Sequence, residues 1–233
     1  VIYQEQNMNT TTGSGVIIRK NANNNQFTQI HKLLVKNAGG TAQVAISGDA
    51  SRVAVASTNE KEIDIYKLNT ANQQYEKEGA TIENTNVNVA GFGKSLSFNT
   101  DGSRLVVGTN NGFYILGTTA PGGAWTSVQD FLGTVGTAGH DFGRAVSISG
   151  NGECIVVSSP NQGNINVYKK DANANTFTLD TTIISTYGGL GKQFAYDIVI
   201  SKDGSKIITS APGYDSTGKN NNGVVIVYKK DGN

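Results

Sequence analysis

The sequence predicts an all-β protein made of one short unit that recurs about every fifty residues. Three observations support this prediction. A turn sequence recurs around Ala50, Gly102, Gly152 and Gly204. The runs that flank each turn alternate apolar and polar residues, as a strand with one buried face does, and no helical periodicity separates them. Four short antiparallel strands repeated at this spacing are typical of propeller blades, so we expect a β-propeller.

The first strand of each unit is predicted from four runs, at residues 43–47, 95–99, 145–149 and 197–201. Apolar residues occupy the same two positions in all four runs. Since neighbouring side chains of a strand point to opposite faces, positions two residues apart lie on one face. The residues at these positions are Val44, Leu96, Val146 and Ile198, followed by Ile46, Phe98, Ile148 and Ile200.

The remaining strands follow in the same order in each unit. The second strand reads VAVAS, LVVGT, IVVSS and IITSA, and the third reads IDIYK, FYILG, INVYK and VIVYK. A fourth strand carries an aromatic residue, which is Tyr75, Trp125 or Phe177. Because these aromatic residues recur at one place in the unit, we expect them to pack between neighbouring units rather than to stack on sugars.

We interpret residues 1–233 as a single propeller domain. The N-terminus joins the pattern, because residues 19–30 resemble residues 169–180 and place Phe27 opposite Phe177. Both terminal units contain second and third strands, so they cannot be two halves of one blade. About five blades could close into a ring, or the chain could be a segment of a six- or seven-bladed ring. The units are residues 1–39 (partial), 40–91, 92–141, 142–192 and 193–233 (partial).

The composition excludes several classes of protein. Of 233 residues, 37% are hydrophobic and 16% are charged, and the net charge is +1. Such a small net charge produces no strong electrostatic attraction to nucleic acid or anionic lipid, so we expect no nucleic-acid binding. The apolar runs are far shorter than the roughly 20 residues that span a bilayer, so we expect no membrane insertion. The single cysteine excludes an internal disulfide.

The recurring phrase resembles the FG-GAP repeat family, whose members form the propeller of the integrin α subunit. Phe92-Gly93 and Phe142-Gly143 supply the FG element, and Phe194-Ala195 is a weakened copy. The GAP element, the second part of the motif, is retained at residues 158–160 and 210–212. The resemblance covers essentially the whole chain. It implies a propeller fold whose loops face a protein partner.

Calcium binding, which integrin-like members perform with Asp-rich loops, is not expected in this chain. Each corresponding loop offers at most one carboxylate, from Asp49, Asp101, Glu153 or Asp203. Because Ca²⁺ takes six to eight oxygen ligands, one acid per loop is inadequate. We expect Asx-type turns instead, in which the side chain accepts a backbone N–H two residues on. The sequence predicts no metal site and no cofactor.

No catalytic constellation is evident in the sequence. His31 and His140 lie at non-equivalent positions, and no phosphate loop, nucleophile elbow or metal-spaced cluster is present. His140 and Asp141 invite a general-base interpretation, but adjacent side chains of an extended chain point apart. A hydrolase with its site in the central channel would need converging His and carboxylate side chains. We therefore predict no catalytic residues and no enzyme.

Two sets of residues are candidates for binding. The long loop at residues 211–223 carries Tyr214, Asp215 and Lys219, and long loops on a rigid scaffold often bind partners. Residues 7–15 occupy the equivalent place in the first unit.

The second set is basic and consists of Arg52, Arg104 and Lys206, at the position that Cys154 holds in the remaining unit. These residues could form a ring of positive charge that meets an acidic partner. We favour the alternative that they are solvated charges at strand starts, which discourage pairing between sheet edges.

The leading hypothesis is a non-enzymatic interaction or structural scaffold that binds a protein partner or neighbouring subunit. An extracellular, cell-surface or virion-surface location is favoured. The alternative is a lectin-like propeller that binds glycans between blades. That alternative predicts the same polar and aromatic residues in the loops of every unit, whereas in this sequence core and turn residues recur and the loops diverge.

Overall fold

Nineteen strands in five antiparallel sheets make up the part of the chain that the structure, a computed structural model, describes. The described residues are 2–6, 13–20, 26–34, 42–118, 123–132, 141–186, 193–215 and 222–230. The sheets follow one another along the chain, and no helix occurs among these residues. The all-β prediction is therefore confirmed.

Each sheet is built from strands that are consecutive in the chain. The first sheet contains β1 (Ile2–Gln6), β2 (Gly13–Lys20) and β3 (Phe27–Leu34). The second contains β4 (Ala42–Ile46), β5 (Arg52–Ser57), β6 (Glu62–Asn69) and β7 (Gln74–Lys77), with β8 (Ile82–Glu83) paired to β6. The third contains β9 (Ser95–Phe98), β10 (Arg104–Gly108), β11 (Gly112–Thr118) and β12 (Trp125–Leu132). The fourth contains β13 (Val146–Ile148), β14 (Cys154–Ser159), β15 (Asn164–Lys170) and β16 (Phe177–Ile184). The fifth contains β17 (Ile198–Ile200), β18 (Lys206–Ala211) and β19 (Val224–Lys229).

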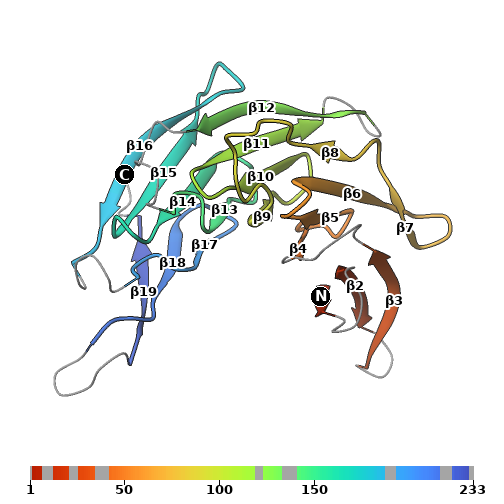
Figure 1. The fold of residues 1–233 in the computed structure, drawn as a ribbon, viewed down its shortest axis with the longest axis horizontal. Helices are drawn as coiled ribbons and strands as arrows, with labels where there is room; N and C mark the ends of the chain where they lie inside the picture. Colours follow the sequence, from red (N-terminus) through yellow and green to blue (C-terminus); the bar gives the residue numbers. More distant parts are fainter. Residues whose placement is uncertain are drawn as a thin grey trace.

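The sheets form an open arc, with β4, β9, β13 and β17 on its inner side and β7, β12 and β16 on its outer side (Figure 1). Strands within the third and fourth sheets are neighbours in chain order, as expected for propeller blades. The first sheet and β19 lie at opposite ends of the arc. The four-stranded antiparallel sheets are confirmed, whereas the number of blades and the closure of a ring are not.

Four sheets share one register, which allows equivalent positions to be compared directly. In each of these sheets, the first residue of the second strand pairs with an equivalent residue of the third strand. The pairs are Arg52 with Lys67, Arg104 with Gly117, Cys154 with Lys169 and Lys206 with Lys229.

The hydrophobic core lies between neighbouring sheets. The phenylalanines of the three FG elements, Phe92, Phe142 and Phe194, are each at most 2% exposed. Each packs in a cluster with residues of the sheet that precedes its own. Full burial of such a side chain contributes about 2 kcal/mol, so the FG elements hold successive sheets together.

Glycine is required after two of these phenylalanines because the sheets approach closely there. A Cβ on Gly143, which has a φ of +92°, would lie 2.0 Å from the carbonyl oxygen of Gly112 in the preceding sheet. A Cβ on Gly93 would lie 2.6 Å from the Cβ of Ala56, which is also in the preceding sheet. Ala195 keeps a left-handed φ of 61° although it carries a side chain.

The aromatic residues of the fourth strands pack between sheets, as predicted. Tyr75 and Phe177 are buried, and Trp125 packs partly buried against the core. The ring of Trp125 lies 5.8 Å from the guanidinium carbon of Arg52 in the preceding sheet. The ring of Phe177 likewise lies 5.8 Å from the guanidinium carbon of Arg104 in the preceding sheet.

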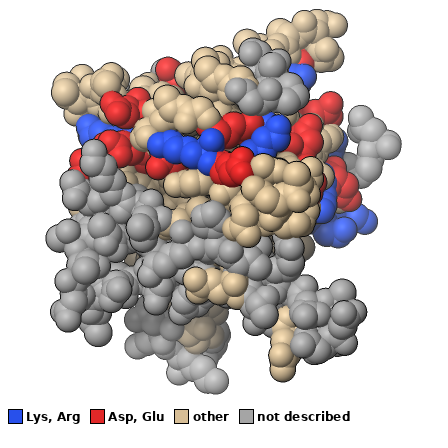
Figure 2. Space-filling view, turned by 90° about the vertical axis from the view of Figure 1, so that its right-hand side faces the viewer, with Lys and Arg blue, Asp and Glu red and all other residues tan. Residues whose placement is uncertain are grey.

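Acidic and basic side chains alternate in a band across one side of the molecule (Figure 2). Neither sign gathers into a large patch on the described part of this side. Within the described ranges, no helix is long and apolar enough to cross a membrane.

Candidate functional site

The candidate residues of the long loop are only partly described. The Tyr214 side chain is half-buried and packs against the core between the fourth and fifth sheets. Its carbonyl accepts the Gly223 N–H at 3.1 Å, which draws the two ends of the loop together. Asp215 is half-buried as well, and Lys219 lies outside the described residues. The proposed binding role of this loop stays a prediction.

The basic set does not form a ring of exposed charges. Arg52 is buried, and its Nε and Nη2 donate to the two carboxylate oxygens of Glu78 at 2.6 and 2.9 Å. Hydrogen bonding to Glu78 raises the pKa of Arg52 although burial opposes this. Arg104 is half-buried and bonds to Asn175, whereas Lys206 is exposed. The charge of Arg52 is therefore compensated inside the protein.

The turns between first and second strands are Asx turns, as predicted. Asp49, Asp101, Asn151 and Asp203 each accept the backbone N–H two residues on, at 2.8 to 3.2 Å. The Ser201 hydroxyl and the Ser205 N–H donate to Asp203 and lower its pKa. Within the described ranges, no group of three or more His, Cys, Asp and Glu side chains could hold a metal ion.

A cavity of about 740 Å³ lies where the inner strands of four sheets begin. We call it the inner cavity. Three side chains that line it, Lys94, Arg144 and Tyr196, occupy one equivalent position directly after the FG element. The repeat therefore brings side chains from three different sheets to one place. Its lining comprises residues 43–44, 94–97, 144–147, 196–199 and Ser210.

Two cations of the inner cavity share one carboxylate. Asp141 accepts a hydrogen bond from Lys94 through Oδ1 and from Arg144 through Oδ2, the latter at 3.0 Å. All three side chains are about three-quarters buried, with exposures of 20% to 26%. The Arg144 guanidinium also lies 3.6 Å from the centre of the Tyr196 ring. Two cations around one carboxylate leave the cluster with a net positive charge, which suits an anionic or electron-rich ligand.

Two serine side chains that line the inner cavity connect neighbouring sheets. The Ser97 and Ser147 hydroxyls accept the Ile148 and Ile200 N–H groups of the next sheet, at 3.2 and 3.1 Å. Asp197, which also lines the cavity, is exposed, and its carboxylate accepts the Ile198 N–H at 2.9 Å. Hydroxyl groups and charged side chains around one cavity are suited to binding a small polar molecule.

This cluster was not predicted from the sequence. The only neighbour that drew attention to Asp141 there was His140, which lies outside the described residues. The partners of Asp141 are Arg144, three residues on, and Lys94 from a different unit. The available signal was the register, since Lys94 and Arg144 follow their FG elements at the same position.

No protein-family model matches the sequence, and no curated protein matches it as a relative. Solved structures of similar fold do exist. One is a protein of Bacteroides uniformis provisionally named 6-phosphogluconolactonase, with a TM-score of 0.66 and 13% identity over 96% of this chain. Another is a periplasmic gluconolactonase of Pseudomonas aeruginosa, with a TM-score of 0.51 and 13% identity over 77% of this chain. A third is TolB of Acinetobacter baumannii, with a TM-score of 0.50 and 16% identity over 98% of this chain.

These similarities confirm the propeller-like fold. The chain spans 62%, 53% and 52% of those three proteins, less than two thirds of each. The FG-GAP resemblance itself is supported by none of the comparisons.

The expectation of a non-enzymatic interaction or structural scaffold was wrong, as was its lectin-like alternative. Proteins of similar fold include ones named as lactonases, so this architecture does not indicate a scaffold. The absence of a recognisable catalytic motif in the sequence likewise does not exclude an enzyme.

Proposed function

We propose that this chain carries the site of a propeller enzyme that hydrolyses the lactone of a sugar acid. The observation that carries the proposal is the Lys94–Asp141–Arg144 cluster at the inner cavity. The lactonase names of three proteins with similar folds add support for the substrate class.

Each charged group has a role in this reaction. Water adds to the lactone carbonyl, the ring C–O bond breaks, and a hydroxy acid is released as its carboxylate and a proton. Negative charge develops on the carbonyl oxygen in the transition state, and Lys94 and Arg144 stabilise it as positioned donors. Asp197 accepts a proton from the attacking water and returns it to the ring oxygen as the ring C–O bond breaks. Asp141 is the positioning residue, because its two oxygens fix both cations.

The rate of lactone ring opening tests this proposal. Gluconolactone and 6-phosphogluconolactone are followed by titration of the acid released, and spontaneous hydrolysis is subtracted. We expect the protein to accelerate at least one of them, and Arg144→Gln to lower the rate about a hundredfold. Lys202→Gln, an exposed lysine beyond the other end of β17, is the matched control and should retain the rate. A folded wild-type protein that accelerates neither lactone would refute the proposal.

We also propose that the arc is part of a larger ring. The face of the fifth sheet that points away from the fourth exposes Val199, Ile208, Val225 and Val227. By register, Ile208 and Val227 correspond to Val156 and Val167, which are buried against the fifth sheet. A face with this pattern is suited to packing against a further sheet.

A further inference from the structure

The third sheet departs from the repeat at a position beside the inner cavity. Just after the second strand, the fourth and fifth sheets have Pro160 and Pro212 at one equivalent position, whereas the third sheet has Asn110. The Asn110 N–H, which a proline lacks, donates to the carbonyl of Ala90 at 2.9 Å. This hydrogen bond ties Asn110 to the segment that leads into the FG element of its own sheet.

A second departure makes room for the Asn110 side chain. Gly91 directly precedes the FG element of the third sheet, at the position where the fourth and fifth sheets have Asp141 and Gln193. All three residues have a left-handed φ, of 69°, 57° and 53°. A Cβ on Gly91 would lie 2.5 Å from the Oδ1 of Asn110, so a side chain at this position would displace the amide. The third sheet therefore combines glycine at one position with an amide side chain at the other.

The Asn110 side chain contacts the charged cluster of the inner cavity. Its Oδ1 accepts a hydrogen bond from the Nζ of Lys94 at 3.1 Å, and Asp141 accepts a second one from the same nitrogen. An ammonium group has three N–H donors and no acceptor, so these two contacts leave one N–H. Lys94 lines the inner cavity, and its side chain is 26% exposed. Among the described residues, Asp141 and Asn110 are thus the two acceptors that set the direction of the third N–H.

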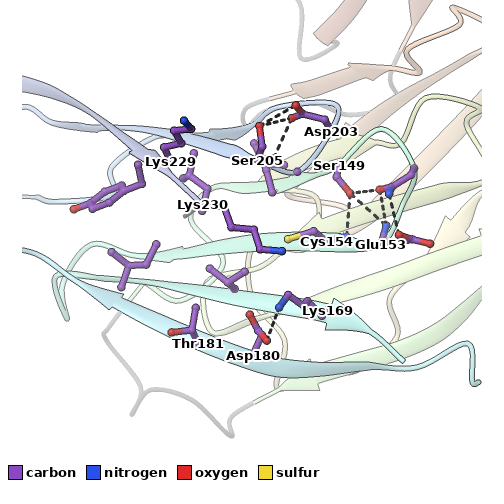
Figure 3. Close-up of a pocket in the computed structure, with 17 residues that line it drawn as sticks. Ser149, Glu153, Cys154, Lys169, Asp180, Thr181, Asp203, Ser205, Lys229 and Lys230 are labelled. Atoms are coloured by element: carbon purple, nitrogen blue, oxygen red, sulfur yellow. Dashed lines mark hydrogen bonds and ion pairs between the residues drawn. The ribbon is translucent and has the colours of Figure 1, made fainter. Parts of the chain in front are cut away.

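A lysine in a different cavity illustrates the arrangement without an amide. Lys169 lines a cavity of about 580 Å³ between the fourth and fifth sheets and forms a 2.8 Å ion pair with Asp180 (Figure 3). The Lys169 side chain is 47% exposed, and within the described ranges Asp180 is its one carboxylate partner. A single acceptor leaves an ammonium group free to turn about that one hydrogen bond, whereas two acceptors fix it. Lys94 is therefore held more firmly than Lys169.

We propose that Asn110 is a positioning residue of the inner cavity, which holds the Lys94 ammonium so that its third N–H is directed at the ligand. This inference rests on the proposed function, because Asn110 acts on the reaction through Lys94. The third N–H donates to the lactone carbonyl oxygen as negative charge develops there. Without the amide, Lys94 is paired with Asp141 alone, and a fixed donor becomes a mobile one.

The Lys94 ammonium group can be observed directly by NMR. Protons of an exposed lysine ammonium exchange rapidly with water, and hydrogen bonds slow this exchange. We expect a Lys94 ammonium signal in the wild-type protein, assigned by its loss in Lys94→Arg, under conditions in which Lys169 gives no signal. Asn110→Leu, which keeps nearly the same size and removes the acceptor, should speed the exchange about tenfold and abolish the signal. Asn110→Asp retains an acceptor oxygen and should keep the signal.

Steady-state kinetics separate positioning from substrate binding. Asn110→Leu should lower kcat about tenfold and change KM less than about twofold, because the third N–H acts on charge that develops in the transition state. Asn110→Asp should recover part of the rate. Asn88→Leu, at an exposed asparagine of the preceding loop, is the matched control and should leave both the Lys94 signal and the rate unchanged. Asn110→Ala is a second variant without the acceptor and inserts no bulk.

The NMR and kinetic results distinguish this inference from the proposed function. A Lys94 signal that persists in Asn110→Leu and Asn110→Ala would overturn the inference, and so would an unchanged kcat in an active protein. If the wild-type protein accelerates neither lactone, the proposed function is refuted, and the NMR comparison still decides whether Asn110 holds Lys94. Loss of the signal in both variants, with its retention in Asn110→Asp and Asn88→Leu, supports the inference in either case.

Discussion

Ala50 occupies a turn position at which the next three sheets have glycine. Its φ is 59°, and those of Gly102, Gly152 and Gly204 lie between 67° and 73°. A left-handed backbone is unfavourable for any residue with a Cβ, so Ala50 carries strain that its glycine counterparts do not.

This difference predicts opposite effects for a matched pair of substitutions. Ala50→Gly should raise the free energy of unfolding by about 1 kcal/mol, and Gly204→Ala should lower it by a similar amount. A Cβ on Gly204 would meet its nearest atoms at 3.7 Å, an ordinary contact, so the effect reports the backbone alone. Denaturant unfolding measures the free energy of unfolding of both variants. A change of the same sign in the two would contradict the explanation from backbone strain.

The sequence predicts local features of single residues well and long-range ones poorly. The Asx turn at Asp203 was predictable because its partner Ser205 lies two residues on. The burial of Arg52 was not, because its partner Glu78 comes from the end of another strand and its ring contact Trp125 from another sheet. An arginine at a strand start therefore looked like a solvated charge.

Individual strands were predictable because period-two alternation and a common register recur in every unit. The short strand β8, which pairs with Glu62 and Ile63, shows no repeat pattern and was missed. The inner cavity was missed for a related reason. Lys94 belongs to the third sheet and Arg144 to the fourth, and only the stacking of sheets brings them to Asp141.

The buried Arg52–Glu78 pair lies at the contact between the second and third sheets. Its side chains are only 8% and 3% exposed, and Glu78 also accepts the Trp125 Nε1–H. Glu78→Gln leaves a buried guanidinium without its counter-charge, so we expect a loss of about 3 kcal/mol in unfolding free energy. Glu76→Gln, an exposed glutamate of β7, should cause no measurable loss. Thermal or denaturant unfolding compares the two, and equal stability of both variants would show that the pair does not hold the sheets.

At the scale of the whole molecule, the exposed face of the fifth sheet predicts unequal effects of one substitution at two equivalent positions. Val167 is 7% exposed and Val227 is 59% exposed. Val167→Thr places a hydroxyl in the core and should cost about 1–2 kcal/mol of stability, whereas Val227→Thr should cost less than about 0.5 kcal/mol. Equal losses on denaturant unfolding would mean that another part of this chain covers the Val227 face.

We assign the proposed function to the inner cavity. The most direct test of this assignment is the mapping of backbone amide chemical shifts during titration with 6-phosphogluconate, the product acid of the proposed reaction. We expect the largest changes at residues 94–97, 144–147 and 196–199, and their loss in Arg144→Gln but not in Lys202→Gln. No shift changes at saturating ligand, or changes confined to other surfaces and unaffected by Arg144→Gln, would contradict the assignment.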